Sequence, residues 1–197
     1  MNFDLDEEHD EIAELATRIL GDHLNLEVLK RTEDSQEWFD RGLWEKFVSS
    51  GLTGATLKED VGGAGLDIIA LVCLLRSQGQ HVAPIPLLPT LVSAMTVDKF
   101  GTEGQRSSLL PEVASGSKLL TFAAQELLND QFMEPDTSYE NGAINGQKIV
   151  VEYADLADSA LVTAMDDDEP VICIVNLEDP SITMQSKDST RGEPLWE

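Results

Sequence analysis

The hydrophobic residues of this sequence change their spacing once, near residues 115–119. Before that point apolar side chains recur every three or four positions, as in Ile12, Ala16 and Leu20, which is the period of one helix face. From residue 119 onward they fall into short runs rich in β-branched residues, LLTFAA, KIVVEY, SALVTAM and VICIVN, which are typical of strands. The sequence therefore predicts an α+β chain. We expect a helical domain over residues 1–117 and a mostly antiparallel, barrel-like β domain over residues 118–197.

Three further stretches of the first half predict helices. Phe39, Leu43 and Phe47 share one helix face, and Gly51 is well placed to end that helix. Asp67 can cap a helix whose residues 68–75 are apolar all round, so we expect that helix to be central and buried. A short helix with Leu91, Met95 and Val97 is expected after three prolines that break helices: Pro84, Pro86 and Pro89.

Local turn and capping signals complete this outline. Thr102 and Gln105 have the spacing of a capping box, and Gly116 follows the helix that they would begin. In the β half, Asn141-Gly142 and Asn145-Gly146 predict turns. The acidic residues 166–169 predict the tip of a hairpin, because they join two strand-like runs.

The charge of the chain excludes several partners. With 37 acidic and 13 basic side chains, its formal net charge is −24, which would repel nucleic acid and anionic membrane surfaces. Cys73 and Cys173 lie in apolar runs without the spacing of a disulfide framework or a zinc site. The N-terminus has no signal-peptide pattern, and the longest apolar run is too short to cross a bilayer. We therefore expect a cytoplasmic protein without a metal site.

The glycines in KEDVGGAGLD, residues 58–67, allow two interpretations. Dense glycines can let a backbone approach a phosphate, but a dinucleotide fingerprint needs a strand before them and a helix after them. The preceding residues 43–56 look helical or irregular, and no Gly-Lys-Ser/Thr follows as in a P-loop. A tight bend that lets two helices cross closely is therefore favoured over a phosphate cradle.

This stretch also resembles the "GL…PE-x-x-GG-x-G" segment of acyl-CoA dehydrogenases. Similar stretches follow in the family's order and cover essentially the whole chain, and the proline segment resembles a branch that includes steroid side-chain dehydrogenases. They are FDLDEE at residues 3–8, FGTEGQR at 100–106, LP at 110–111, ASG at 114–116, NGQK at 145–148 and DSTR at 188–191.

The resemblance implies a reaction and a domain plan. In that family a helical domain and a β domain precede a C-terminal four-helix domain, and FAD lies between the last two with help from a neighbouring subunit. The enzyme removes a proton α to an acyl-CoA thioester and passes a hydride to the flavin, and an electron-transfer flavoprotein then accepts the electrons. The sequence ends at Glu197, so the four-helix domain and its catalytic glutamate are expected to be absent. No catalytic residue is assigned, although the carboxylate of Glu126 is a tempting candidate.

Two segments align with the family's flavin-contacting motifs. Residues 122–131 align with "F/Y-x-x-T-E-P-x-x-G-S": Phe122 and Glu126 match, whereas Gln125 replaces the threonine and Gln131 the serine. Residues 150–152 align with "W-I-T/S", so the aromatic is lost and a carboxylate replaces the hydroxyl. An ionised carboxylate cannot donate a hydrogen bond to a flavin nitrogen. The residues that the resemblance assigns to FAD are Phe122, Ala124, Gln125, Glu126, Val150, Val151 and Glu152, and Gln131 is assigned to the substrate.

Three functions remain open at this point. The chain is the first part of an acyl-CoA dehydrogenase, or the flavin-poor subunit of a heteromeric dehydrogenase, or a non-enzymatic module that binds acyl-CoA or acts as a scaffold. The first two are favoured together, as a dehydrogenase-like subunit that is inactive alone and assembles with itself or with another subunit. The histidines at positions 9, 23 and 81 have no spacing that supports a different enzyme class.

Overall fold

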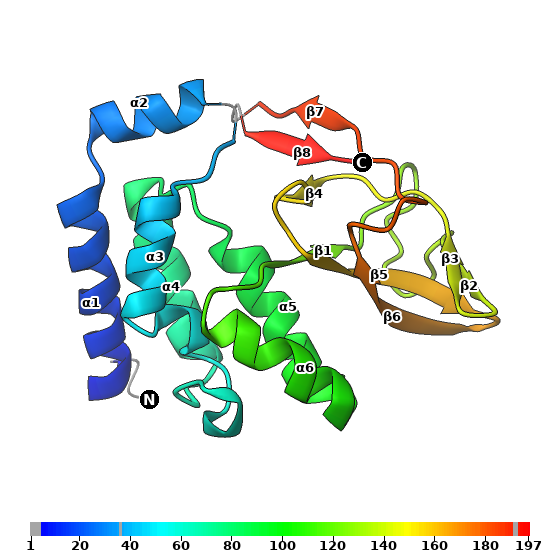
Figure 1. Cartoon of the computed structure of the whole chain (residues 1–197), viewed down its shortest axis with the longest axis horizontal. Helices are drawn as coiled ribbons and strands as arrows, with labels where there is room; N and C mark the ends of the chain where they lie inside the picture. Colours follow the sequence, from blue (N-terminus) through cyan, green and yellow to red (C-terminus); the bar gives the residue numbers. More distant parts are fainter. Residues whose placement is uncertain (1–4, 36, 191–192) are drawn as a thin grey trace. The chain divides into compact units, whose positions relative to one another are not determined.

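The computed structural model describes residues 5–35, 37–190 and 193–197. It divides the chain into two compact units, Met1–Lys118 and Leu119–Glu197. Among the described residues the first unit is helical and the second consists of strands and loops (Figure 1). The helices are α1 (Glu7–His23), α2 (Leu26–Asp34), α3 (Arg41–Ser49), α4 (Ile68–His81), α5 (Leu87–Phe100) and α6 (Glu103–Ala114), with 3-10 turns η1 (Leu52–Gly54) and η2 (Glu59–Val61).

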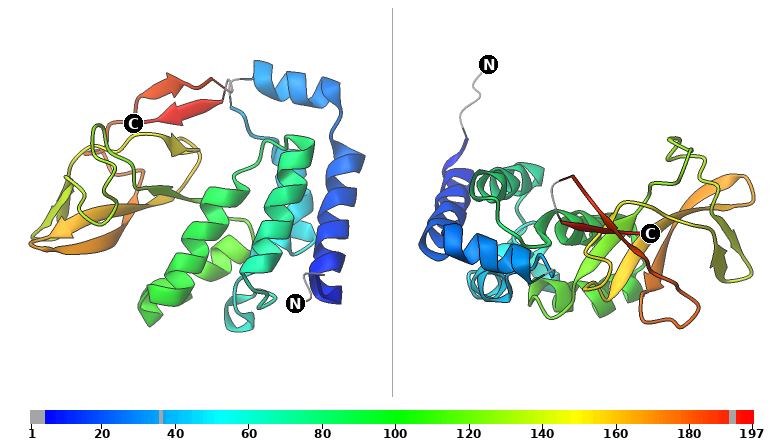
Figure 2. Two further views of the ribbon diagram at one scale, coloured as in Figure 1. Left: turned by 180° about the vertical axis from the view of Figure 1, so that it is seen from behind. Right: turned by 90° about the horizontal axis from the view of Figure 1, so that it is seen from above.

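Helix α1 forms as its sequence predicts. Asp6 caps it by accepting a hydrogen bond from the backbone N–H of His9, and acidic residues fill the first turn, where the helix dipole favours them. The predicted face of Ile12, Ala16 and Leu20 is buried. In the first unit this helix packs against α3 and α4 (Figure 2). The resemblance placed Phe3 and Asp4 at the start of this helix, but both lie outside the described residues.

Helices α2 and α3 differ in how far the sequence predicts them. Helix α2 was not expected, because it is short, Thr32 is its one buried residue, and its apolar Val28 and Leu29 are only half-buried. Helix α3 begins only at Arg41, capped by Asp40. The buried Phe39 thus precedes the helix that it was expected to join. Gly51 follows the helix end with a left-handed backbone (φ 73°), as predicted.

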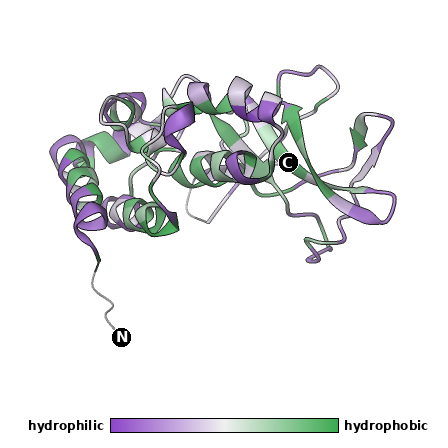
Figure 3. Cartoon of the chain, turned by 90° about the horizontal axis from the view of Figure 1, so that it is seen from below, coloured by the Kyte–Doolittle hydropathy of each residue, from purple (hydrophilic) through white to green (hydrophobic). Residues whose placement is uncertain are grey.

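Helix α4 confirms its predicted cap but not its predicted burial. Asp67 accepts hydrogen bonds from the backbone N–H groups of Ile69 and Ala70. The expectation that residues 68–75 are buried all round is wrong: Ile68, Ile69 and Val72 are 40–55% exposed, and the buried face holds Ala70, Leu71, Cys73, Leu74 and Ser77. Colouring by hydropathy shows apolar and hydrophilic positions along the same helices (Figure 3). In the described part of the chain no helix is long and apolar enough to span a bilayer.

The proline and capping signals before α5 and α6 have different outcomes. Pro86 stands at the N-cap of α5, and Pro89 lies inside the first turn, so the prediction that Pro89 breaks a helix is wrong. A first-turn proline is tolerated because its missing N–H would have no partner within the helix. The capping box of Thr102 and Gln105 is confirmed at the start of α6.

The strands of the second unit form two sheets. The larger has the order β1-β5-β2-β3, with β6 on the other edge of β5, and the smaller has the order β4-β8-β7. A small core of alanine and valine side chains, with Ile144 and Trp196 packed against it, holds this unit together. The strands are β1 (Leu120–Ala123), β2 (Ser138–Glu140), β3 (Ala143–Asn145), β4 (Val151–Glu152), β5 (Ser159–Asp166), β6 (Glu169–Asn176), β7 (Ser186–Asp188) and β8 (Pro194–Trp196).

The α+β prediction is confirmed, but the sheet differs from the expected antiparallel barrel. Strand β5 runs antiparallel to β6 and parallel to both β1 and β2. The parallel pairing of β1 and β5 is possible because the 35 residues between them return the chain to the same edge. The described strands remain two separate sheets and do not close into a barrel. The predicted strand KIVVEY contributes only the two residues of β4.

Two of the three predicted turns are confirmed. Asn141 and Gly142 both have positive φ (51° and 82°) and join β2 to β3, as a type I′ hairpin requires. Asp167, with φ 52°, lies at the tip between β5 and β6. The prediction of a turn at Asn145-Gly146 is wrong. Gly146 lies so close to Thr137 that a Cβ would collide with it, so this glycine serves close packing.

Candidate functional site

The two segments that align with flavin motifs lie side by side in the second unit. The backbone N–H of Ile149 donates to the carbonyl oxygen of Gln125 at 2.9 Å, which forms an isolated antiparallel bridge. The hydroxyl of Thr121 in β1 donates to the carbonyl oxygen of Glu152 in β4 at 2.7 Å. Residues 122–126 and 148–152, far apart in sequence, therefore form one continuous candidate site.

Glu126 is a buried carboxylate whose two oxygens are both occupied. Lys148 Nζ lies 2.6 Å from Oε1, which also accepts from the backbone N–H and the hydroxyl of Thr137. Oε2 accepts from the backbone N–H of Asp136 at 2.5 Å. Burial raises the pKa of Glu126, but these hydrogen bonds, led by that from Lys148, outweigh it and lower the pKa to about 2. Glu126 is therefore a fixed anion and is unsuited to remove a proton near neutral pH.

Lys148 is the buried partner of Glu126 that the sequence did not single out. Its ammonium group also donates to the hydroxyl of Thr163 at 2.9 Å, and its side chain is 8% exposed. The "NG-x-K" resemblance at residues 145–148 was the available signal, because it ends on this lysine. Both acceptors of the Lys148 ammonium group, Glu126 and Thr163, belong to the second unit, so this cation is paired within that unit.

The side chains of the remaining predicted site residues differ in how far they are exposed. Phe122 and Val150 are 37% and 44% exposed, and Gln125 is exposed beside them. Val151 is buried in the core, where its side chain is covered by residues of the same unit. Ala124 and Glu152 are half-buried, and Gln131 is exposed on the following loop.

Val150 has an unusual backbone for a β-branched residue. Its φ is 57°, in the left-handed region, where clashes with the branched side chain make such residues rare. Tyr153 shares this conformation with φ 53°, so both ends of the short strand β4 carry strained residues. Such strain persists where the surrounding structure fixes the chain, and the hydrogen bond to Gln125 immediately precedes Val150.

The side chains of this site do not by themselves fit an anionic flavin. No Lys or Arg occurs between Lys118 and Lys148, and Lys148 is already paired. A carboxylate stands at Glu152, where the family has a hydroxyl donor, so it would oppose negative charge on a reduced flavin. The amide of Gln125 is the side-chain donor that remains.

The glycine-rich stretch of the first unit is a packed bend. Gly62 and Gly65 have φ of 90° and 72°, and a Cβ on Gly63 would collide with the carbonyl oxygens of Leu57 and Gly54. The backbone N–H groups of residues 62–66 all donate to carbonyl oxygens of residues 54–59, at 2.7–3.1 Å. With these donors already used, the stretch cannot cradle a phosphate, and the bend interpretation is confirmed.

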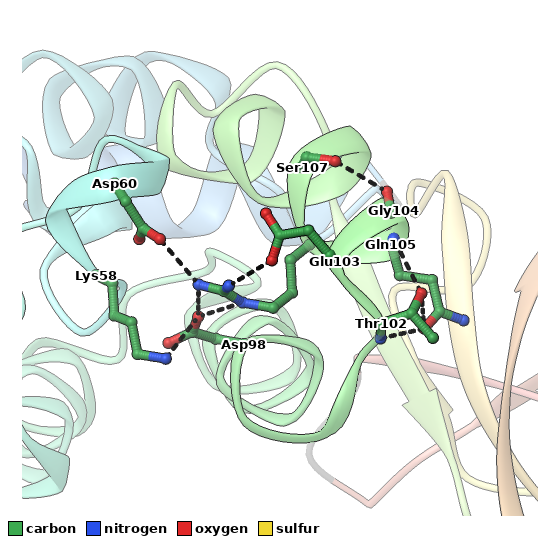
Figure 4. Close-up of polar contacts among 9 residues, drawn as sticks. Lys58, Asp60, Asp98, Thr102, Glu103, Gly104, Gln105 and Ser107 are labelled. Carbon is green, nitrogen blue, oxygen red and sulfur yellow. Dashed lines mark hydrogen bonds and ion pairs between the residues drawn. The ribbon is translucent and has the colours of Figure 1, made fainter.

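A half-buried arginine of the FGTEGQR stretch connects it to this bend, through the carboxylates of Asp60, Asp98 and Glu103 that Figure 4 labels. Arg106 donates to Asp98 at 2.9 and 3.0 Å, to Asp60 at 3.3 Å and to Glu103 at 3.1 Å. Lys58 also lies 3.5 Å from Asp98. Ion pairs thus join two of the stretches that carry the resemblance. Their charged residues therefore have a structural role. Among the described residues no group of three His, Cys, Asp or Glu side chains could hold a metal ion.

Comparison with known proteins identifies the family. The sequence profile described as "Acyl-CoA dehydrogenase, N-terminal domain" matches residues 6–117, more than half of the chain. The chain belongs to the acyl-CoA dehydrogenase family. The resemblance stated from the motifs is thereby confirmed, although Arg191 of the DSTR stretch lies outside the described residues.

Members of this family with known names include two from Mycobacterium tuberculosis. Acyl-CoA dehydrogenase FadE27 is 24% identical over 191 residues, which cover 96% of this chain and 51% of that protein. Acyl-CoA dehydrogenase FadE28 is 35% identical over 125 residues, which cover 61% of this chain and 36% of that protein. The chain thus spans about half or less of the length of these relatives.

Solved structures of the family show the same fold. A variant of the Tcur3481-Tcur3483 steroid ACAD is 36% identical with a TM-score of 0.92, over 96% of this chain and 54% of that one. The ChsE4-ChsE5 complex from Mycobacterium tuberculosis has a TM-score of 0.91 at 23% identity, over all of this chain and 54% of that one. A glutaryl-CoA dehydrogenase from Mycobacterium smegmatis, solved in complex with FADH2, shares the fold at 19% identity over 98% of this chain and 52% of that one, with a TM-score of 0.80.

Proposed function

We propose that this chain is part of an acyl-CoA dehydrogenase subunit that takes part in α,β-dehydrogenation of an acyl-CoA thioester with FAD. We further propose that it is inactive alone. The pairing of residues 122–126 with residues 148–152 supports the first statement, because the two segments that would face the flavin are brought together. The saturated carboxylate of Glu126 supports the second, because the tempting base is not available for proton transfer.

The residues present define what this chain would contribute to such a site. Bound FAD would supply the hydride acceptor, and the exposed side chains of Phe122, Gln125 and Val150 would lie beside it. The exposed Gln131 would meet the substrate. The base and the cations for the phosphates would come from another subunit or from other parts of the protein. An electron-transfer flavoprotein would accept the electrons, as in the family.

A second candidate function is the flavin-poor subunit of a heteromeric dehydrogenase. The carboxylate of Glu152 and the lack of an unpaired Lys or Arg among residues 119–152, all of which the structure describes, favour it, because an assembly with a second, intact subunit tolerates such losses. The 36% identity with a chain of the Tcur3481-Tcur3483 steroid ACAD supports a heteromer and a steroid-type acyl chain. A scaffold that binds acyl-CoA without catalysis is the alternative to both.

Reconstitution distinguishes both dehydrogenase functions from the scaffold. The chain would be mixed with purified Tcur3481 or Tcur3483, and the visible spectrum and thioester oxidation by an artificial electron acceptor would be recorded. The dehydrogenase proposal expects no flavin spectrum or turnover from the chain alone, and flavin together with turnover in one of the mixtures. Stable mixtures without flavin or turnover would contradict it and favour the scaffold.

A further inference from the structure

The imidazole ring of His9 lies between two carboxylates that cap two different helices. Its Nδ1 lies 2.6 Å from Asp6, and its Nε2 lies 2.8 Å from Asp67. Asp6 caps α1, and Asp67 caps α4, the helix that directly follows the glycine-rich bend. All three residues belong to the first unit, and His9 is 9% exposed. We call these three residues the His9 clamp.

The two contacts of the ring together require that it is charged. An ionised carboxylate only accepts hydrogen bonds, whereas a neutral imidazole has one N–H group and one nitrogen lone pair. Because each ring nitrogen of His9 faces a carboxylate, both contacts are satisfied only when both nitrogens carry a proton. The charged ring also places one positive charge between two negative ones. The geometry of the clamp is therefore that of the protonated state.

Loss of the proton from His9 leaves one of the two caps facing a lone pair. A neutral ring with its proton on Nδ1 turns the lone pair of Nε2 toward Asp67, and the other tautomer turns a lone pair toward Asp6. A carboxylate that turns away from the ring also leaves the backbone N–H groups that it caps. Asp67 Oδ1 accepts from Ile69 and Ala70 at 2.8 and 3.4 Å, and Asp6 Oδ1 accepts from the N–H of His9 at 3.0 Å.

The neighbouring helices bring one other titratable group into this region. Cys73 lies on the buried face of α4, and burial raises the pKa of its thiol from 9.0, so the thiol remains mostly neutral below pH 9. Three carboxylates add to this effect and one guanidinium opposes it: Asp10, Asp67, Asp6 and Arg76. Helix α3 also packs against α1, and its buried residues are apolar: Leu43, Trp44 and Phe47. The titration in this region between pH 6 and pH 9 is therefore that of His9.

We propose that the His9 clamp is a proton-operated device: the protonated ring holds the caps of α1 and α4 together, and loss of the proton releases one of them. The hydrogen bond to Asp67 raises the pKa of His9, aided by the charge of Asp6 and opposed by burial, so the release occurs above pH 6.5. The clamp is thus closed in mild acid and opens toward alkaline pH. This inference requires neither flavin nor a partner, so its outcome is independent of the proposed function.

The test measures amide hydrogen exchange by NMR from pH 6 to pH 9, with each rate divided by the intrinsic rate at that pH. Exchange reports local opening of the hydrogen bond that protects each amide. The amide of residue 9 reports on the cap at Asp6, and the amides of Ile69 and Ala70 report on the cap at Asp67. These amides distinguish which of the two caps is released.

The first turn of α2 supplies a matched internal control. Asn25 Oδ1 accepts from the backbone N–H groups of Glu27 and Val28 at 2.9 and 3.0 Å, the same two helix positions, but asparagine does not titrate. Two variants remove the proposed device. His9→Gln has no titrating ring, and Asp67→Asn places an amide that can either donate to the ring or accept from it. Circular dichroism at pH 6 would confirm folding, and Asp67→Asn carries the test if His9→Gln is not folded.

We expect the protection of one cap in the wild type to fall about fivefold from pH 6 to pH 9 relative to the α2 amides, as for loss of one hydrogen bond. This pH dependence should be absent in both variants. A wild-type ratio that does not change with pH would overturn the proposal, and so would the same fall in either folded variant. An equal fall at the α2 amides would also overturn it, because the whole unit would then loosen without a specific role for His9.

Discussion

Lys148 and Glu126 form an ion pair of 2.6 Å in which both side chains are less than a tenth exposed. The pair joins the two segments that align with flavin motifs, since one partner comes from each. The ionised Glu126 also accepts a hydrogen bond from the backbone N–H of Asp136 and so anchors the loop between them. One buried contact therefore supports both the candidate site and this loop.

Replacing Lys148 with methionine should destabilise the second unit strongly. Glu126 would remain buried without its cation, and loss of one partner of a buried pair costs about 3–5 kcal/mol. Lys187→Met is the matched control, because Lys187 pairs with Glu197 at 3.0 Å with a side chain that is 49% exposed. That surface pair should contribute less than about 1 kcal/mol. Urea unfolding followed by circular dichroism measures both, and equal effects would show that the Glu126 pair is not buried in solution.

The stability of the chain should fall in acid because of Glu126. Its folded pKa is lowered from 4.5 to about 2, so its stabilising contribution is present above pH 4.5 and is lost as the pH falls toward 2. The shift corresponds to about 3 kcal/mol at most. Unfolding free energies of the wild type and of Glu126→Gln, measured from pH 6 to pH 2, should converge in acid. Parallel curves would indicate that Glu126 titrates normally.

His9 should give the stability of the first unit the opposite pH dependence. Its Nε2 lies 2.8 Å from Asp67 and its Nδ1 lies 2.6 Å from Asp6, so one imidazole contacts the N-caps of both α4 and α1. The hydrogen bond to Asp67, aided by Asp6, raises the pKa of His9 against the effect of burial. The stabilisation is fully present below pH 6.5 and is lost as the pH rises through the raised pKa.

The measurement for His9 is an NMR titration of its ring. We expect the His9 resonance to titrate above the ordinary value and to return toward it in Asp67→Asn. If the His9 titration does not change in Asp67→Asn, the contact between His9 and Asp67 does not form in solution.

The glycine-rich bend gives a paired prediction. A Cβ on Gly63 would collide with two carbonyl oxygens, so Gly63→Ala should cost about 3 kcal/mol or more. Gly65 has φ 72° with nothing within 4 Å of its Cβ position, so Gly65→Asn should be nearly neutral. Thermal unfolding compares the two variants. Similar losses for both would mean that conformation alone, and not the close approach at Gly63, requires the glycines.

The elements of the fold that the sequence predicted are those with local signals. Caps and turns such as Asp67, Thr102 and Asn141-Gly142 were predictable, because each depends on a few neighbouring residues. Helix α2 was missed since its few apolar side chains, Val28 and Leu29, are only half-buried beside the buried Thr32. The exposure of α4 was missed because an apolar run does not reveal that a neighbour covers only one face.

The candidate site was predictable only through the family resemblance. The motif alignment selected residues 122–126 and 150–152, but it could not show that they meet through Gln125 and Ile149. The parallel pairing of β1 with β5 and the contact of Lys148 with Glu126 are long-range. Neither has a period or a spacing that a single sequence displays.

We propose that this chain alone holds FAD weakly, because Glu152 opposes negative charge and the Gln125 amide is the side-chain donor that remains among residues 122–126 and 150–152. This proposal is tested most directly by the affinity of the chain alone for FAD, measured by quenching of flavin fluorescence for the wild type, Glu152→Thr and Glu140→Thr. Glu140 is an exposed strand residue of the same unit outside residues 122–126 and 148–152, so its variant removes the same charge without changing those residues. We predict no saturable binding by the wild type or Glu140→Thr and measurable binding by Glu152→Thr, in which a hydroxyl donor is restored. Stoichiometric FAD binding by the wild-type chain alone would contradict the claim.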